Sequence, residues 1–316
     1  MAAFTAGELK RLYWLEESNY GVTLASTELK YGADLVSFNN GAEPNQEIEQ
    51  HADSRAYAPA SCVITRMDHG FKLKQAQVRA PISGYDWTKP LLYGAMGSAG
   101  GFSALGRLPS FSMLTGLTAG ATSHYSIYSG CKVNSLSMSC ERAGGRVMFE
   151  ADVMAQYLAR TTALALTGFQ SKTLGSLGAI PAAAVLQWKA PFVITPSGGS
   201  ARTVYPEPWT LRINNNLQRA GGAVTGADSN VYTITEQLHE GKAEIELEMK
   251  LYLEDLTAIN EMLENTAVTS VSTVIGGKTI TLGSGHHKVD GNAWPELKQD
   301  VMDQTLRFRF STMTVA

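Results

Sequence analysis

The sequence has few charged residues for its length. Asp, Glu, Lys and Arg make up 17% of its 316 residues, against about 25% in typical soluble domains. The formal net charge is −3, so the chain lacks the general basic field with which many proteins bind nucleic acid. Glycine, in contrast, occurs 30 times. This composition indicates that neighbouring molecules cover much of the surface, although a nearly neutral, loop-rich β protein would have the same composition.

Cysteine is scarce as well. The three cysteines, Cys62, Cys131 and Cys140, are an odd number and show no CxxC spacing, so they predict neither a disulfide framework nor a metal site. Cys140 shares its position parity with Leu136 and Met138. We therefore expect Cys140 to be a small core residue with a reduced thiol.

Long apolar runs are missing. The longest, at residues 177–186, contains Pro181 and is too short to span a bilayer. Residues 1–11 lack the apolar segment of a secretory signal. We expect a soluble chain that stays in the compartment where it is made and has no membrane partner.

Motifs of catalysis are also missing. Residues 94–101 are glycine-rich but lack the Gly-Lys-Ser/Thr ending of a phosphate loop, and there is no GxSxG or HExxH. The neighbouring His286 and His287 have no third ligand nearby in the sequence. Glu150 and Asp152 could form an acid–base pair, but a solvated strand face explains them more simply. We predict no catalytic residue, no metal site, no cofactor and no enzyme activity.

Strict alternation of apolar and polar residues is what the sequence does contain. After a turn at residues 141–145, the apolar positions are Val147, Phe149, Ala151, Val153 and Ala155, and the positions between them carry Met148, Glu150, Asp152 and Met154. A period of two after a Gly-Gly turn predicts a β-hairpin with one buried face.

The same pattern returns in the second half of the chain. Residues 208–217 alternate, a long polar segment follows, and residues 241–255 alternate more strictly. There Ile245, Leu247 and Met249 stand between Glu244, Glu246, Glu248 and Lys250. A long hairpin that occurs twice suggests duplication, and we predict an arm at residues 1–12, a first domain at 13–184 and a second at 185–316.

The remaining elements are predicted from shorter patterns. Strands are expected at residues 29–39, 60–81, 188–195, 270–275, 279–282 and 305–314. Short helices are expected at residues 86–97, ending at Gly97, and at residues 255–265. Residues 40–58 are polar and rich in turn formers, so we predict a loop there. Residues 98–130 are expected to be a loop with one strand at 124–128, and residues 161–184 an interdomain connection.

At the hairpins the chain resembles the tail tube (major tail) proteins of long-tailed bacteriophages. The resemblance lies in GCKVNSLSMSCERAGGRVMFEADVMAQYL, which begins at Gly130, and in WTLRINNNLQ, which begins at Trp209 and is followed by HEGKAEIELEMKLYLED. The phrases WLEESNYGVT and DWTKPLLYGAMGS also look like landmarks of that family. Each motif is soft, and it is their order and spacing that make the likeness specific.

The resemblance implies a mainly β fold: two tandem tail-tube domains of the β-sandwich or half-barrel kind, each with long hairpins and a short flanking helix. It implies rings that stack into a hollow tube, the conduit for genome delivery into the host. Three chains of this length would form a pseudo-sixfold ring, which we favour over six chains. The implied partners are further copies, the tape measure protein, and tail terminator and tip proteins. DNA would pass without specific binding, and the protein would be assembled in the host cytoplasm into the virion tail.

Two sets of site residues follow from this reading. A duct for DNA should have acidic or neutral walls, because a basic wall would hold phosphates. We predict that Glu150, Asp152, Glu244, Glu246 and Glu248 line the lumen and make it acidic, offset partly by Arg146 and Lys250; an outward-facing placement is the alternative. Contacts between rings are predicted for the N-terminal arm, residues 40–58 and the C-terminal strand, with Phe4, Leu12, Trp14, Glu43, Asn45 and Glu47 as candidates.

Two other functions remain open from the sequence. The tube of a contractile tail or injection system would share the fold and would differ by a sheath-binding outer surface. A carbohydrate-binding or adhesin-like β module would present exposed aromatic residues on a strand face, whereas Trp188, Trp209 and Trp294 fall at strand starts or in loops.

Overall fold

The computed structural model is mainly β. It describes residues 11–17, 20, 30–49, 61–83, 85–97, 108–119, 122–161, 182–219, 224–228, 231–234, 238–252, 261, 264, 266–288, 296–298 and 301–316. Nearly all of the strands in this part of the chain join one 17-stranded sheet, and β11 and β14 form a separate pair. Antiparallel pairing is found throughout, as the predicted hairpins require.

The strands are, in order, β1 Arg11–Glu16, β2 Lys30–Glu49, β3 Ser61–Gln77, β4 Phe111–Ala119, β5 Thr122–Cys140, β6 Met148–Ala155, β7 Tyr157–Thr161, β8 Phe192–Pro196, β9 Arg202–Val204, β10 Trp209–Asn214, β11 Gln218–Arg219, β12 Val224–Asp228, β13 Val231–Ile234, β14 Leu238–His239, β15 Glu244–Tyr252, β16 Val268–Ile275, β17 Lys278–His287, β18 Glu296–Lys298 and β19 Val301–Val315. Helix α1 spans Leu91–Met96, and Glu261 is also helical.

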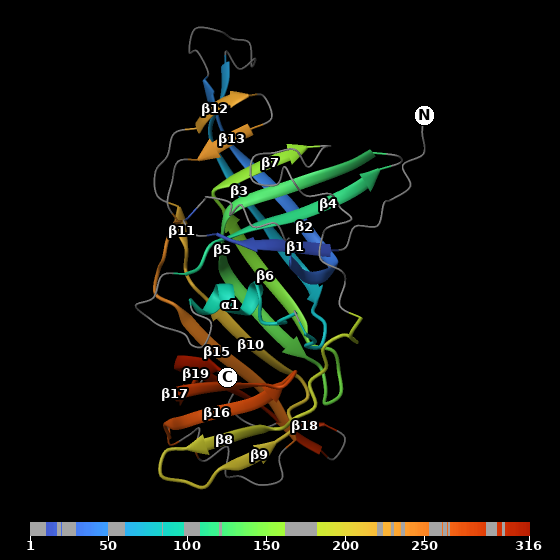
Figure 1. Cartoon of the computed structure of the whole chain (residues 1–316). Coiled ribbons are helices and arrows are strands. Elements are labelled where there is room, and N and C mark those ends of the chain that lie inside the picture. The colour runs from blue at the N-terminus through green and yellow to red at the C-terminus, as the bar shows by residue number, and fades with distance from the viewer. Residues whose placement is uncertain are drawn as a thin grey trace.

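The strands of the first half close on themselves. β1 pairs with β2, β2 with β3, β3 with β6, β6 with β5, β5 with β4, and β4 with β1 again. Closure of a sheet leaves no exposed strand edge along the closed part. Figure 1 shows these strands, from blue to green, in the upper part of the molecule.

The second half continues the same sheet. β10 pairs with β5 on one side and with β15 on the other, and the sheet then runs through β19, β17, β16 and β8 to β9. Residues 185–188 contact both halves. Val185 and Gln187 form bridges to Arg79 and Arg146 of the first half, and Trp188 forms a bridge to Ile275 of the second. One core cluster contains residues from both halves, from Leu12 to Val315. The predicted division at residue 184 stays a prediction, and the two sides share a sheet.

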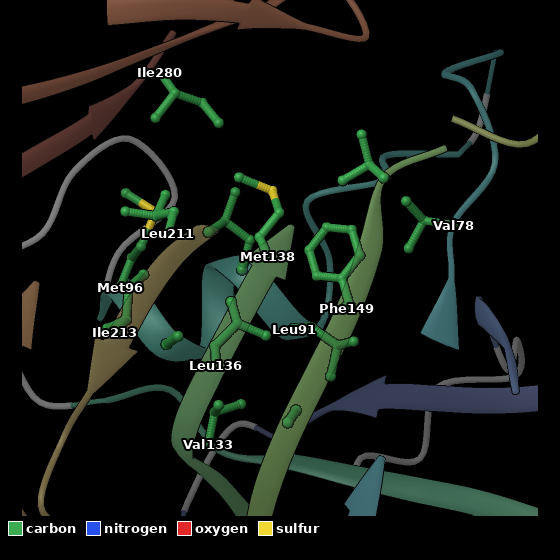
Figure 2. Close-up of a cluster of buried hydrophobic side chains, with 14 of the residues drawn as sticks. Val78, Leu91, Met96, Val133, Leu136, Met138, Phe149, Leu211, Ile213 and Ile280 are labelled. Carbon is green, nitrogen blue, oxygen red and sulfur yellow. The ribbon is translucent and has the colours of Figure 1, made fainter. Parts of the chain in front are cut away.

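Helix α1 covers the apolar side of this junction. It packs against β5 and β10, and Figure 2 shows Leu91 and Met96 of the helix beside Leu136, Met138 and Ile213 of the strands. Gly94 lets the helix approach closely, since a Cβ atom there would lie 2.6 Å from the Phe111 ring. The helix ends at Gly97, which has the left-handed φ of 79°, as expected of a glycine after a helix.

Several predicted elements are confirmed. The two long hairpins are β5–β6 and β10–β15, the Gly-Gly turn between β16 and β17 is present, and the last strand is β19. Cys140 is buried, and so is Cys131. The helix predicted at residues 255–265 lies outside the described residues except for Glu261 and Glu264, and most of the predicted connection at residues 161–184 also lies outside them.

Two loop predictions are wrong. Residues 40–49 are the second half of β2 and pair with residues 61–70 of β3. Residues 111–119 form β4, which pairs with β5 from Thr122 on. Both stretches are polar or rich in Ser, Thr and Gly and so lack the apolar alternation that marks a strand. Their backbone pairing is supplied by a neighbouring strand, which composition does not reveal.

A bulge changes which side of β3 is buried. Phe71 and Leu73 are buried, but further along the buried positions are Ala76 and Val78. The register of β3 against β6 shifts between Leu73 and Ala76. An inserted residue reverses the parity of a strand, which is why simple alternation across the predicted strand 60–81 fails.

Candidate lumen face and assembly surfaces

The predicted lumen residues lie on one continuous polar face. In β6, Glu150 is opposite Ser137 of β5; Ser137 is opposite Arg212 of β10. Arg212 is opposite Glu246 of β15, and Glu246 is opposite Arg309 of β19. The two hairpins predicted separately are therefore adjacent, and their polar rows are in register across five strands.

The opposite face of the same strands is the core. Its parallel row contains Phe149, Met138, Leu211, Leu247 and Phe308, which face one another in register and are all buried. Figure 2 shows the Phe149, Met138 and Leu211 side chains gathered on this side. Because side chains alternate along a strand, this burial fixes the carboxylates on the other face.

The five carboxylates differ in their surroundings. Glu150 is exposed, and Asp152, Glu244, Glu246 and Glu248 are half-buried. Asp152 accepts a hydrogen bond of 3.1 Å from the side-chain amide of Asn134, a residue at a register shift in β5. The structure thus confirms that these residues share a face. Whether that face lines a lumen stays a prediction.

Basic residues share this face with the predicted carboxylates. Glu246 pairs with Arg309 at 2.9 Å and with Lys288 at 3.2 Å. Glu248 pairs with Arg307 at 3.3 Å and with Arg212 at 3.6 Å. With Lys250 and the exposed Arg146, these cations number six against the five carboxylates among the described residues.

The ion pairs alter the titration of one carboxylate. Burial acts to raise the pKa of Glu246, but the hydrogen bonds from Arg309 and Lys288 outweigh it, and the pKa is lowered. Sequence reasoning missed Arg212, Arg307, Arg309 and Lys288 as part of this face. The alternation in the TLRFRF segment placed Arg307 and Arg309 on a polar side, but only the pairing of β15 with β19 shows that this side carries Glu246 and Glu248.

A buried carboxylate connects the N-terminal motif to the first hairpin. Glu17, at the end of WLEE, accepts hydrogen bonds from the backbone N–H of Gly130 at 2.9 Å and from the Ser112 hydroxyl at 2.7 Å. Gly130 has a φ of 65°, which a residue with a side chain rarely adopts. The segment that opens GCKVNSL is therefore a bend in β5, held by Glu17.

A buried amide explains the WTLRINNNL motif. Asn215 follows β10 directly and is 2% exposed. Its side-chain nitrogen donates to the carbonyl oxygen of Ala95 in α1 at 3.2 Å and to that of Val133 in β5 at 2.9 Å. One side chain thereby joins the helix, the first hairpin and the second hairpin.

The segment between β10 and β15 crosses back to the first half. β13 pairs with β7, and the short strands β11 and β14 pair with each other. Glu240, after β14, contacts the buried Lys132 ammonium group at 2.7 Å and accepts from the Leu108 N–H at 3.0 Å. An ion pair with this degree of burial fixes where the crossing segment sits.

The predicted contacts between rings fall in different environments. Leu12 and Trp14 are in β1 and lie in the core, with exposed fractions of 0% and 2%. Glu43, Asn45 and Glu47 lie in β2, opposite Asp68, Arg66 and Val63 of β3. Phe4 lies outside the described residues. Their role between rings stays a prediction, and for Leu12 and Trp14 the side chains are already packed within their own chain.

The distal parts of β2 and β3 form a two-stranded arm, residues 42–49 and 61–68. In the described structure, β3 begins to pair with β6 only at His69, and β2 pairs with β1 only at residues 30–34. Figure 1 shows the arm projecting beyond the main sheet at the top of the molecule.

Two further observations bear on the other functions considered. Trp188 and Trp209 are buried, at 0% and 1% exposure, so neither belongs to a surface for sugar stacking; Trp294 lies outside the described residues. Within the described ranges, no group of three or more His, Cys, Asp and Glu residues is arranged to hold a metal ion. Nor does that part of the chain contain a helix long and apolar enough to cross a membrane.

Comparison with known proteins identifies the family. No curated protein matches the chain. The model of the family described as phage tail tube protein matches residues 7–310, which includes both hairpins, α1, the arm and residues 301–310 of β19. The chain therefore belongs to the phage tail tube protein family and is a structural component of the virion tail.

Proposed function

We propose that this protein polymerises into stacked rings of three copies and forms the hollow tail tube of a long-tailed phage, through which the genome is delivered into the host. The observation that carries the proposal is the continuous polar face across β6, β5, β10, β15 and β19. Two hairpins side by side give each chain a wall of double width, so three chains supply six hairpins.

In the proposed tube, the polar face lines the lumen, with Glu150, Asp152, Glu244, Glu246 and Glu248 pointing inward. The buried apolar face and α1 then lie toward the outside of the wall. Balanced charges on the lumen side suit a duct for DNA, since neither strong attraction nor strong repulsion of phosphates would act along it. The five carboxylates serve to neutralise the basic residues of the wall.

The arm is proposed to contact the adjacent ring, together with the N-terminal residues and the C-terminal strand. Among the described residues, the strands of the arm form backbone ladders only with each other, and such strand edges offer backbone donors and acceptors to another chain. A contact of this head-to-tail kind repeats from ring to ring and generates a stack. The tape measure protein inside the tube, and terminator and tip proteins at its ends, are the further partners that this assembly requires. We propose that assembly takes place in the host cytoplasm.

The test is microscopy of the purified protein before and after concentration, with mass photometry of the unassembled form. The expected result is a tube of stacked rings with threefold symmetry, with Glu150 and Glu244 facing the channel in the reconstruction. A protein that stays monomeric under all conditions would contradict polymerisation. Rings of six chains would contradict the stoichiometry alone, and a sheath around the tube in virions would assign it to a contractile tail.

A further inference from the structure

The polar face contains a hollow surrounded by cations. It has a volume of about 130 Å³ and lies over β10, β15 and β19, with Thr210, Arg212, Glu246, Glu248, Lys288 and Arg307 around it. Its floor is formed at Leu247 and Phe308, whose side chains belong to the core. The long side chains of arginine and lysine form the rim of this hollow.

The charges around the hollow are unequal. The cationic cluster, which we define as Arg212, Lys288, Arg307 and Arg309, surrounds Glu246 and Glu248. Of these, Arg212, Lys288 and Arg307 line the hollow together with the two carboxylates, so positive side chains outnumber negative ones around it on a chain whose net charge is −3. The Arg212 and Arg307 side chains are 57% and 43% exposed, so their charge acts on the solvent side.

The two carboxylates hold the cations in place. Each lies between two basic groups: Glu246 contacts Arg309 and Lys288, and Glu248 contacts Arg307 and Arg212. Contacts of this kind reduce the number of rotamers available to a long side chain, so less entropy is lost when an anion binds. A guanidinium presents five donors in a planar fork that matches carboxylate and phosphate oxygens.

We propose that this hollow binds a phosphate group, and that through it the wall of the tube makes a weak contact with the DNA backbone. The inference rests on the proposed function for the identity of the ligand, while the site itself belongs to the single chain. Arg212 and Arg307 donate to the phosphate oxygens, Lys288 adds charge, and the Thr210 hydroxyl stands at the edge. The contact is independent of base sequence because only phosphates are recognised.

A site of this strength would hold each passing phosphate only briefly. The charge of the lining side chains is partly screened, since the Debye length is about 8 Å at physiological salt. DNA would then be guided along the wall by rows of weak sites rather than kept away from it. The expected signature is a steep loss of binding as salt increases.

The experiment titrates the unassembled full chain with inorganic phosphate and with a short DNA duplex at low salt, followed by calorimetry and fluorescence anisotropy. Wild-type protein is expected to bind both. The double variant Arg212→Gln/Arg307→Gln should bind about a hundredfold more weakly, because each of the two lost charge-assisted hydrogen bonds to phosphate is worth about tenfold. For the duplex, the slope of log K against log salt should fall by about 0.9 for each lost contact.

Two matched variants separate this site from general charge effects. Arg142→Gln removes a positive charge at the exposed β5–β6 turn and should leave both affinities unchanged. Glu246→Gln/Glu248→Gln raises the local charge of the hollow and should tighten duplex binding. Circular dichroism and thermal unfolding check that each variant is folded.

Absence of phosphate and duplex binding by the wild type at low salt would overturn the inference, and so would unchanged binding in the Arg212→Gln/Arg307→Gln variant. Equal weakening by Arg142→Gln would show a diffuse charge effect and would also overturn it. If rings and tubes form but phosphate does not bind, the proposed function stands without this site. If phosphate binds but no ring forms, the tube proposal fails and the site remains.

Discussion

His287 is buried although it is ionisable. It is 7% exposed, its ring lies 4.7 Å from that of Phe308, and neither ring nitrogen has a hydrogen-bond partner among the described residues. Burial, with smaller contributions from the charges of Arg202 and His286, lowers the pKa of His287 to about 4. The imidazole is therefore neutral in the folded chain at neutral pH.

This burial predicts a loss of stability in acid. The unfolded chain takes up the proton near pH 6.5 and the folded chain only near pH 4, so stability is fully present above pH 6.5 and falls as pH drops through this window. At pH 5 the loss is about 2 kcal/mol from this residue. Urea unfolding at pH 8 and pH 5 should show that His287→Phe loses less stability than wild type by about this amount. Equal losses in both proteins would contradict the prediction.

Asn215 gives a second prediction at this scale. Asn215→Ala removes both amide donors and leaves the buried carbonyl oxygens of Ala95 and Val133 without this partner. A buried polar group that loses its partner costs about 1–3 kcal/mol, so the unfolding free energy should fall by at least that amount. The exposed Gln218 provides the control, and Gln218→Ala should change it by less than about 0.5 kcal/mol. If Gln218→Ala lowers the free energy of unfolding as much as Asn215→Ala does, the prediction for the buried amide is contradicted.

At the scale of elements, apolar alternation identified the strands whose neighbours cover one face. Ile245, Leu247 and Met249 are buried between half-buried polar residues, and Leu306, Phe308 and Phe310 follow the same rule in β19. Alternation could not identify the distal half of β2 or β4. Those strands exist because β3 and β5 supply hydrogen bonds along their whole length, and that is a property of the partner.

The arm can be removed without touching the core. Ala42 and His69 are direct partners, so residues 43–68 can be replaced by an Asn-Gly turn that joins them as a two-residue hairpin. The β3–β6 pairing and the burial of Phe71 and Leu73 are retained, and we expect the variant to fold. Because the proposed contact with the next ring is lost, it should form no tubes in the microscope.

Normal tubes from this shortened chain would contradict the role of the arm. If circular dichroism shows the shortened chain to be unfolded, the arm is needed for folding of the core. A control in which Asn-Gly replaces only residues 50–60, the connection between β2 and β3, keeps both paired strands and tests the tip separately.

At the scale of the molecule, the sequence predicted two hairpins, but not that they form one sheet. The β5–β10 pairing joins residues about seventy positions apart, and nothing in either strand's alternation specifies its neighbour. For the same reason, the sequence alone did not predict the charge of the polar face. Glu246 and Glu248 were visible as a row of carboxylates, while the arginines opposite them come from β10 and β19.

The last prediction concerns the charge of the proposed lumen. Glu150 and Glu244 lie on the polar face outside the cationic cluster, so Glu150→Lys/Glu244→Lys raises the charge of the face by four per chain without breaking the ion pairs of Glu246 and Glu248. Duplex DNA carries one charge per ~1.7 Å of its axis, and a basic wall should hold it. Tubes should form, but release of DNA from phage carrying the variant should be slower, most strongly at low salt, where screening is weakest. Glu141→Lys/Glu264→Lys changes charge equally at exposed positions elsewhere and should release DNA at the wild-type rate. Equal release by both double variants would place the polar face away from the path of the genome.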